Sequence, residues 1–169
     1  MIRKILIGLV AIFILIQFFR PAKNNSGAAP HPMSAKYPMT PEMETLFKDA
    51  CYNCHSNKTE YPWYAEVQPV AWWLANHVKE GKQHLNFDEF TSRRIAFQNH
   101  KLEEIAEQVK EREMPLPSYT WLGLHKEADL TDDKRNIIIN WAEAQMDTLK
   151  NQYPADSLRM PRRNGPPPK

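Results

Sequence analysis

Two cysteines and a histidine stand together in the segment Cys51-Tyr-Asn-Cys-His55, and the chain has no other cysteine. Thiols at positions i and i+3 of a helical turn can meet the two vinyl groups of one haem. The histidine that follows is then placed to bind the iron from the proximal side. The spacing therefore predicts one covalent haem c, attached at Cys51 and Cys54, with His55 as the first axial ligand of the iron.

Three other interpretations of this motif stay open. A closed zinc site needs about four nitrogen or sulfur ligands. There is no second cysteine pair to supply them, although His77 or His84 could contribute. A thioredoxin-like dithiol belongs in a βαβ setting, whereas the surrounding sequence indicates helices. The third interpretation is a local disulfide between Cys51 and Cys54 with an incidental histidine beside it. We favour the haem over all three.

Met114 is the predicted sixth ligand of the iron, 59 residues after His55. Pro115 biases the residue before it away from helical geometry, so Met114 should sit on a turn just after a helix. Ligation by histidine and methionine raises the reduction potential and fills both axial positions, which favours electron transfer. An ordinary core methionine is the alternative. His77 is the rival ligand, although a histidine on the apolar side of a helix more often bonds a carbonyl.

We call the segment Cys51-Tyr-Asn-Cys-His55 the attachment motif. A group of aromatic residues follows it, at Tyr61-Pro-Trp-Tyr64 and Trp72-Trp73. Such rings can exclude water from a haem and lower the local dielectric constant, and the polar atoms of Tyr or Trp can bond haem propionates. Ordinary core filling explains the same residues equally well. We count Tyr61, Trp63 and Trp73 among the predicted cofactor-binding residues.

The domain that positions these residues is expected to span residues 40–150. Thr40-Pro41-Glu42 predicts a helix start, with a capping oxygen, a proline at the first helical position and early acidic residues. Thr131-Asp132-Asp133 predicts the start of the last helix in the same way. Both ends of the domain are therefore helical.

Three further helices are indicated between these two. One covers residues 69–80, with Gly81 suited to terminate it. Another is capped by Asp88 and runs through Phe97, and a fourth carries apolar residues from Leu102 to Val109. No strand-like alternation competes with these patterns. The predicted fold class is all-α: a cytochrome c-like helical domain wrapped around one covalent haem, with an N-terminal transmembrane helix.

Residues 1–20 carry that predicted transmembrane helix. Two basic residues precede a run from Ile5 to Phe19 that is apolar except for Gln17. The pattern predicts an uncleaved signal-anchor, although a helix of this length is short for a bilayer. The alternative is a signal peptide that is cleaved near Ser26-Gly27-Ala28.

The charge is divided along the chain. Residues 40–150 have a net charge of −6, whereas the segments on either side of them are basic. An acidic body argues against a nucleic-acid partner and favours docking onto a basic patch of a redox protein partner. Residues 21–39 are expected to be a flexible tether and residues 151–169 a disordered, Pro-rich basic tail.

The order of these features resembles the bacterial single-haem proteins known as the haem-binding domain family. The Met-Pro turn and the helix after it look more loosely like the closing part of class I cytochromes c. The resemblance implies attachment at Cys51 and Cys54, His55 as proximal ligand and Met114 as distal ligand. The long insert over residues 61–97 departs from a minimal cytochrome c. The matching segments within 47–142 are Cys51-Tyr-Asn-Cys-His-Ser56, Tyr61-Pro-Trp-Tyr64, Gln68-Pro-Val70, His77-Val-Lys-Glu-Gly81, Leu85-Asn-Phe87, Met114-Pro115 and Trp141.

The resemblance implies that haem is attached on the outer side of the bacterial cytoplasmic membrane. We therefore expect a single-pass protein of the inner membrane with its haem domain in the periplasm, or a soluble periplasmic protein if the N-terminal segment is cleaved. The leading functional prediction is an electron carrier rather than an enzyme. The rivals are a haem peroxidase or a gas or redox sensor with a labile sixth ligand, and a haem-dependent structural or docking module.

Overall fold

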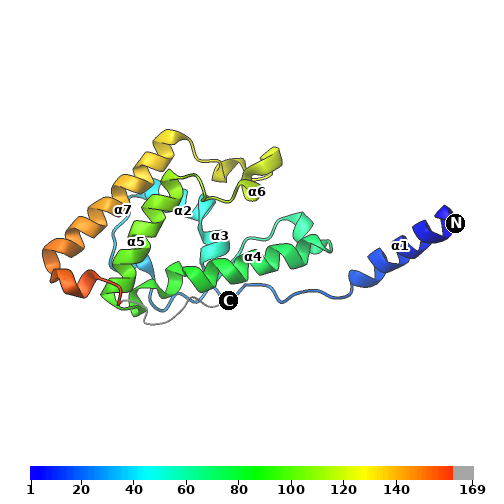
Figure 1. Ribbon diagram of the computed structural model, residues 1–169, viewed down its shortest axis with the longest axis horizontal. Helices are drawn as coiled ribbons and strands as arrows, with labels where there is room; N and C mark the ends of the chain where they lie inside the picture. Colours follow the sequence, from blue (N-terminus) through cyan, green and yellow to red (C-terminus); the bar gives the residue numbers. More distant parts are fainter. Residues whose placement is uncertain (162–169) are drawn as a thin grey trace. The chain divides into compact units, whose positions relative to one another are not determined.

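The computed structural model describes residues 1–161, apart from the side chain of Leu122. Its secondary structure within that range is helical, with one isolated bridge between Asn25 and Lys58 (Figure 1). The all-α prediction is confirmed. The chain divides into two units: the first contains residues 1–29 and 52–88, and the second contains residues 30–51 and those from Glu89 onward.

The helix of the first unit that packs against the predicted attachment motif is α4 (Val70–His84). Its buried residues Ala71, Leu74 and Val78 recur at helical spacing and form one apolar side. The helix contacts two short elements, the helix α3 (Tyr52–His55) and the 3-10 helix η2 (Trp63–Glu66). The attachment motif therefore rests against α4.

The predicted end of this helix at Gly81 is wrong, because α4 continues to His84. Gly81 lies inside the helix at a close approach to α3. A Cβ atom at this position would lie 2.7 Å from the carbonyl oxygen of Cys54 and 3.2 Å from its Cβ. The glycine is needed there because it lacks a side chain and not because it ends the helix.

The first helix, α1 (Ile2–Ile16), has 15 residues, whereas a spanning helix needs about 20. No helix within residues 1–161 is both long enough and apolar enough to cross a membrane. The predicted transmembrane helix is therefore wrong, and the same finding overturns the predicted single-pass location in the inner membrane. At the end of α1 the Gln17 side chain donates to the Gln68 carbonyl and accepts from the Gln68 N–H at 2.9 Å.

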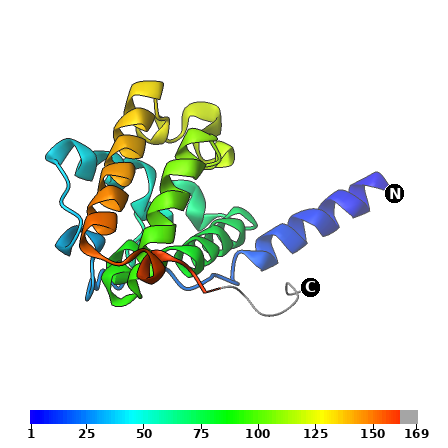
Figure 2. The same cartoon turned by 60° about the vertical axis from the view of Figure 1, so that its left-hand side comes forward.

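The second unit is built on three longer helices: α2 (Pro41–Ala50), α5 (Ile95–Lys110) and α7 (Asp132–Gln152). Helices α5 and α7 lie side by side, as Figures 1 and 2 show from two directions. Helix α2 contacts α7, where the rings of Phe47 and Trp141 meet edge to face with their centroids 5.3 Å apart. The remaining elements are η1 (Met33–Ala35), η3 (Phe87–Ser92, which begins in the first unit), α6 (Pro117–Thr120), η4 (Trp121–Gly123), η5 (Lys126–Ala128) and η6 (Ala155–Leu158).

Both predicted threonine caps are confirmed. The Thr40 side chain accepts a hydrogen bond from the Met43 N–H at 3.2 Å, and the Thr131 side chain accepts one from the Lys134 N–H at 3.4 Å. Each bond satisfies a backbone donor that has no partner inside its helix. The starts of α2 and α7 are therefore encoded locally.

The middle of the predicted pattern differs from the structure. The helices expected on either side of residue 100 are one helix, α5, which begins at Ile95 and not at Asp88. The Asp88 carboxylate is instead occupied by the N–H of Asn57, at 2.6 Å. The Asp88 carboxylate, which the sequence predicts as a helix cap, therefore makes a tertiary hydrogen bond instead.

The segments outside residues 40–150 contain local structure. Residues 21–39, for which the sequence predicts a flexible tether, include the bridge at Asn25 and the buried side chains of Met33 and Tyr37. In the predicted tail, α7 extends to Gln152 and η6 buries Leu158. The rest of that tail, residues 162–169, lies outside the described residues.

Candidate functional site

The attachment motif lies where α2 ends and α3 begins. Cys51 is the C-terminal cap of α2, and its N–H donates to the Phe47 carbonyl at 2.9 Å. Cys54 and His55 follow in the single turn of α3. Both cysteines are in the described part of the chain and no disulfide joins them. The two thiols and the imidazole thus come from five consecutive residues, of which the last four form α3.

The orientation of His55 is the most informative feature of the site. Its Nδ1 atom lies 3.0 Å from the carbonyl oxygen of Leu85. A carbonyl oxygen only accepts, so Nδ1 must carry the hydrogen, and in the neutral ring Nε2 then has the lone pair. Metal-binding histidines are commonly held in this way, by a carbonyl or carboxylate on the second ring nitrogen. The arrangement prepares Nε2 of His55 to bind a metal.

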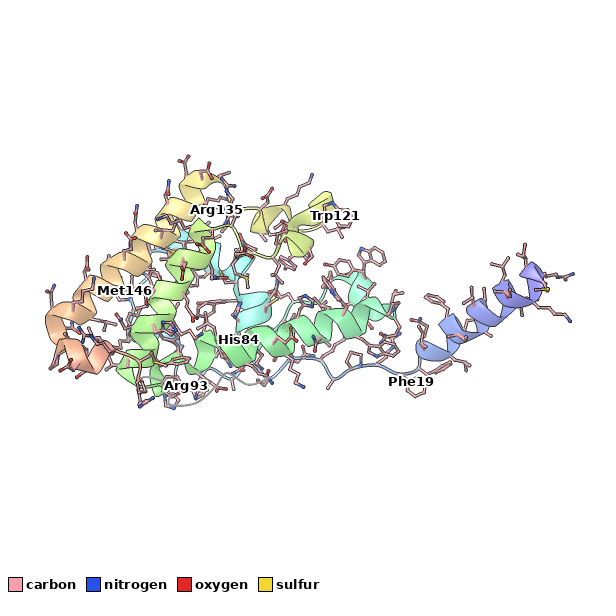
Figure 3. All side chains as sticks on the ribbon, viewed as in Figure 1. Phe19, His84, Arg93, Trp121, Arg135 and Met146 are labelled. Carbon is pink, nitrogen blue, oxygen red and sulfur yellow. The ribbon has the colours of Figure 1, made fainter. Side chains whose placement is uncertain are left out.

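The position of the Leu85 carbonyl is set by the end of α4, of which Leu85 is the C-terminal cap. Figure 3 labels His84, the last residue of that helix. Leu85 then adopts extended backbone angles, φ −153° and ψ 125°, and its N–H still donates to the Gly81 carbonyl at 2.9 Å. The change of direction takes the Leu85 carbonyl out of the helical ladder and makes it available to the imidazole.

One aromatic ring packs against the His55 imidazole, and a second ring packs against the first. The buried ring of Phe87 lies edge to face with His55, with centroids 5.8 Å apart, and lies 5.4 Å from the ring of Tyr52. An apolar neighbour restricts access of water to the imidazole. The sequence offers the segment Leu85-Asn86-Phe87 only as part of a family pattern, and the roles of Leu85 and Phe87 were not predicted.

Cys54 is half-buried and lies against α4. The close approach of Gly81 leaves no room for a side chain beside it, and burial raises the pKa of the Cys54 thiol to about 11. The thiol is therefore protonated at neutral pH. Redox-active cysteines of the thioredoxin type have lowered pKa values, so this environment argues against the predicted dithiol alternative.

Asn24 fixes the loop that follows His55. Its Nδ2 donates to the Ser56 carbonyl and to the Thr59 hydroxyl, each at 2.9 Å, and its Oδ1 accepts from Lys82 Nζ at 2.7 Å. Its backbone N–H donates to the Tyr61 hydroxyl at 2.8 Å. One side chain therefore ties the loop to α4. Sequence reasoning missed this residue because an asparagine in a polar stretch is also typical of a linker.

Asn57 makes a second set of bonds in the same loop. Its Nδ2 donates to the Ala28 carbonyl at 2.7 Å, and its Oδ1 accepts from Asn86 Nδ2 at 2.9 Å. Its backbone N–H donates to Asp88. The loop is thus connected to the segment just after Leu85, so the two sides of the His55–Leu85 bond are held together.

The predicted aromatic wall is spread over the first unit. The Tyr61 hydroxyl accepts a hydrogen bond from the Asn24 N–H, and Lys23 Nζ lies 5.3 Å from the centre of the Tyr61 ring. Trp63 is 76% exposed and Trp73 is 44% exposed. Large apolar side chains with this exposure are available to cover a planar ligand.

His77, the rival iron ligand, is turned toward its own helix. Its Nδ1 lies 2.9 Å from the Trp73 carbonyl, one turn earlier in α4, and its ring lies 4.3 Å from the ring of Trp73. This is the carbonyl bond expected of an ordinary helical histidine. Its Nδ1 is thus held by a carbonyl, as that of His55 is.

Met114 belongs to the second unit and lies outside the helix, as predicted. Helix α5 ends at Lys110, four residues before Met114. The Met114 N–H donates to the Gln108 carbonyl at 3.1 Å, and the Met114 carbonyl accepts from Arg135 at 2.8 Å. The side chain is half-buried, and the bond to Pro115 is cis. Of the predicted site residues, Cys51 and Met114 are in the second unit and the others are in the first.

The donor set within residues 1–161 fits a haem better than a bare metal ion. No group of three or more His, Cys, Asp or Glu residues in that range is arranged to hold a metal, as the zinc alternative requires. A haem brings the equatorial nitrogen ligands itself and needs only axial ligands from the protein. A histidine whose Nδ1 is held by a carbonyl, beside two thiols, meets that requirement.

A family model described as a haem-binding domain matches residues 11–144, which is most of the chain. No curated protein and no solved structure matches. The matched range contains the attachment motif, the Leu85 carbonyl and Met114. The looser likeness to class I cytochromes c is not confirmed.

Proposed function

Because this chain belongs to the haem-binding domain family, we propose that it is a mono-haem c-type cytochrome that transfers electrons. Haem binding follows from the family. Covalent attachment and electron transfer are the proposal. The observation that carries it is the hydrogen bond between His55 Nδ1 and the Leu85 carbonyl, since this bond makes Nε2 the ligand atom of a histidine that follows two cysteines in the sequence.

Cys51 and Cys54 would hold the haem through thioether bonds, and His55 Nε2 would bind its iron. When bound, the haem supplies a one-electron redox couple. The chain's own residues do the rest: Leu85 fixes the histidine tautomer, Phe87 shields the imidazole, and Gly81 lets α4 support the turn that carries Cys54. These contacts keep the ligand geometry constant, which favours fast electron transfer.

Electron transfer is proposed over catalysis because of Met114. A thioether ligand would fill the second axial position and leave no open site for a substrate. The predicted turn is present and its backbone is held at both the N–H and the carbonyl. The negative charge of residues 40–150 suits a redox partner with a basic docking patch, since charge complementarity accelerates encounter.

Covalent attachment is tested on the full chain produced in a host that matures c-type cytochromes. We expect the intact mass under denaturing conditions to exceed that of the polypeptide by one haem, and the pyridine haemochrome spectrum to be that of haem c. The C51A/C54A double variant should lose the haem on acidic acetone extraction, whereas H84A, at an exposed histidine, should retain it. A wild-type mass equal to that of the polypeptide alone would contradict the proposal.

The carrier is separated from the rival peroxidase or sensor by the sixth ligand. We expect a low-spin ferric spectrum with the weak long-wavelength band of methionine–iron ligation, and slow reaction with CO or peroxide. M114A should lower the reduction potential and H77A should not. A high-spin wild-type protein that binds CO readily would favour the enzyme or sensor.

A further inference from the structure

Met114 lies just after the C-terminal cap of α5. Arg112 adopts a left-handed conformation with φ 62°. The Glu113 N–H donates to the Gln108 carbonyl at 3.0 Å, and the Arg112 N–H donates to the Val109 carbonyl at 3.3 Å. These two bonds form a Schellman motif, which satisfies the last carbonyls of α5. The Met114 N–H also donates to Gln108, so the terminus fixes the amide side of Met114.

Arg135 of α7 holds the carbonyl group of Met114. Its Nη1 donates to the Met114 carbonyl at 2.8 Å and to the Val109 carbonyl at 3.0 Å. Figure 3 labels Arg135 near the start of α7, beside the end of α5. One guanidinium nitrogen therefore links Met114 to the last turn of the helix that precedes it. Both backbone polar groups of Met114 are held within the second unit.

This arrangement is costly for stability. The Nε atom of Arg135 is buried and has no hydrogen-bond partner, and burial lowers the pKa of Arg135, with the charge of Arg112 acting in the same direction. A buried donor without a partner lowers the stability of the folded state. An apolar side chain of similar length would avoid that cost. The arginine is better explained by what it positions than by a gain in stability.

We propose that Arg135 is a positioning residue for Met114, and that its bonds to the Met114 and Val109 carbonyls keep the methionine sulfur available as the sixth iron ligand. The inference rests on the proposed function, in which Met114 is that ligand. A turn held at both backbone groups lowers the conformational freedom that ligation would otherwise remove. Without Arg135, the fraction of molecules with Met114 in the competent conformation falls.

The experiment compares R135M with R112M, both in the haem-loaded full chain. Methionine keeps most of the length of arginine but removes both hydrogen bonds and the unpartnered donor. Arg112 is a matched control, because its exposed side chain pairs with Asp132 and bonds neither Met114 nor Val109. The readouts are the long-wavelength band of the ferric protein, the reduction potential, and the affinity for added imidazole, which competes with the methionine.

We expect R135M to bind imidazole at least about tenfold more tightly than wild type, because the competing internal ligand is less often in place. Its long-wavelength band should weaken and its potential should fall, whereas R112M should match wild type in all three. If R135M does not fold, R135K, which keeps the charge but not the planar guanidinium, should show the same direction of change.

Three outcomes separate the inference from the function on which it rests. Covalent haem in R135M with the imidazole affinity of R112M would overturn the inference alone. A wild-type spectrum in M114A would remove the sixth ligand and the inference together, but leave haem attachment standing. A wild-type protein without covalent haem would overturn both the proposed function and the inference.

Discussion

The Nδ1 atom of His55 and the carbonyl oxygen of Leu85 lie 3.0 Å apart although 30 residues separate them in the sequence. Leu85 is the residue at which α4 stops being helical. The orientation of the imidazole in the attachment motif is therefore determined by where another helix ends. A short motif supplies the histidine, and the tertiary structure decides which of its two ring nitrogens carries the hydrogen.

The tautomer of His55 gives the first prediction. In the reduced, haem-loaded protein we expect nitrogen NMR to show a proton on His55 Nδ1 that exchanges slowly with solvent, since it donates to Leu85. The His84 ring is an internal control because it is exposed at the end of α4, and its ring protons should exchange rapidly. A His55 ring without a proton on Nδ1 would show that this hydrogen bond is absent in the loaded protein.

The contact between Gly81 and Cys54 gives the second prediction. In G81A the new methyl group would lie 2.7 Å from the Cys54 carbonyl oxygen, and overpacking of this kind costs about 1–3 kcal/mol. Alanine regains about 1 kcal/mol of helix propensity, so a net loss of up to about 2 kcal/mol is expected. The measurement is denaturant unfolding of the haem-loaded protein, together with the yield of covalent haem.

Gly8 provides the matched control, because a Cβ there meets nothing within 4 Å. G8A changes the same residue type inside a helix and should be neutral or slightly stabilising. Equal stability of G81A and G8A would mean that α4 and α3 do not approach as closely as the structure indicates.

The raised pKa of Cys54 gives the third prediction. Burial disfavours the thiolate, so in the folded, haem-free chain alkylation of Cys54 should rise with pH up to about 11, against about 9 for an ordinary cysteine. Because folding raises the pKa of this thiol, its contribution to the stability of the fold is fully present below about pH 9. That contribution is lost as the pH rises toward about 11. Mass spectrometry after timed alkylation under reducing conditions, with and without urea, measures both profiles. Identical profiles would contradict the burial of Cys54.

Asn24 gives the fourth prediction. N24A removes three side-chain hydrogen bonds, to Ser56, Thr59 and Lys82. At about 0.5–1.5 kcal/mol for each bond, a loss of about 2–4 kcal/mol in unfolding free energy is expected.

The neighbouring Asn25 is the control for that measurement, because it meets Lys58 through its backbone and its side chain is exposed. N25A should be close to wild type. A chain that begins after Ala28 lacks Asn24 and should be destabilised at least as much as N24A. If N24A and N25A unfold at the same denaturant concentration, the loop after His55 does not depend on Asn24.

The parts of the fold that were predicted correctly are encoded within a few residues. The caps at Thr40 and Thr131 act on amides three residues away, and Pro115 biases the residue just before it, so each signal can be read without knowing the tertiary structure. The attachment motif is local in the same sense. It names the ligand, but it does not show what holds the ligand in place.

The predictions are wrong where a residue type is compatible with two local structural roles and a distant contact determines which role it has. Gly81 is suited to end a helix and equally to allow a close approach, and its contact with Cys54 selects the second role. Asp88 is suited to cap a helix, but the Asn57 N–H occupies its carboxylate. The length of α1 is a different case: the apolar run predicts a spanning helix, but the helix has only 15 residues.

The left-handed conformation of Arg112 gives the fifth prediction. A residue with a Cβ pays about 1–2 kcal/mol to adopt φ near +60°, whereas glycine does not, and Arg112 has φ 62°. R112G removes that cost and also the exposed ion pair with Asp132, which is worth no more than about 1 kcal/mol. R112A removes the same ion pair but keeps the Cβ. We therefore expect R112G to exceed R112A by about 1 kcal/mol in unfolding free energy, measured by denaturant titration of the haem-loaded protein at equal m-values. If R112A were the more stable of the two, Arg112 would not hold the left-handed position of the Schellman motif, and the fixed amide of Met114 would lose its structural basis.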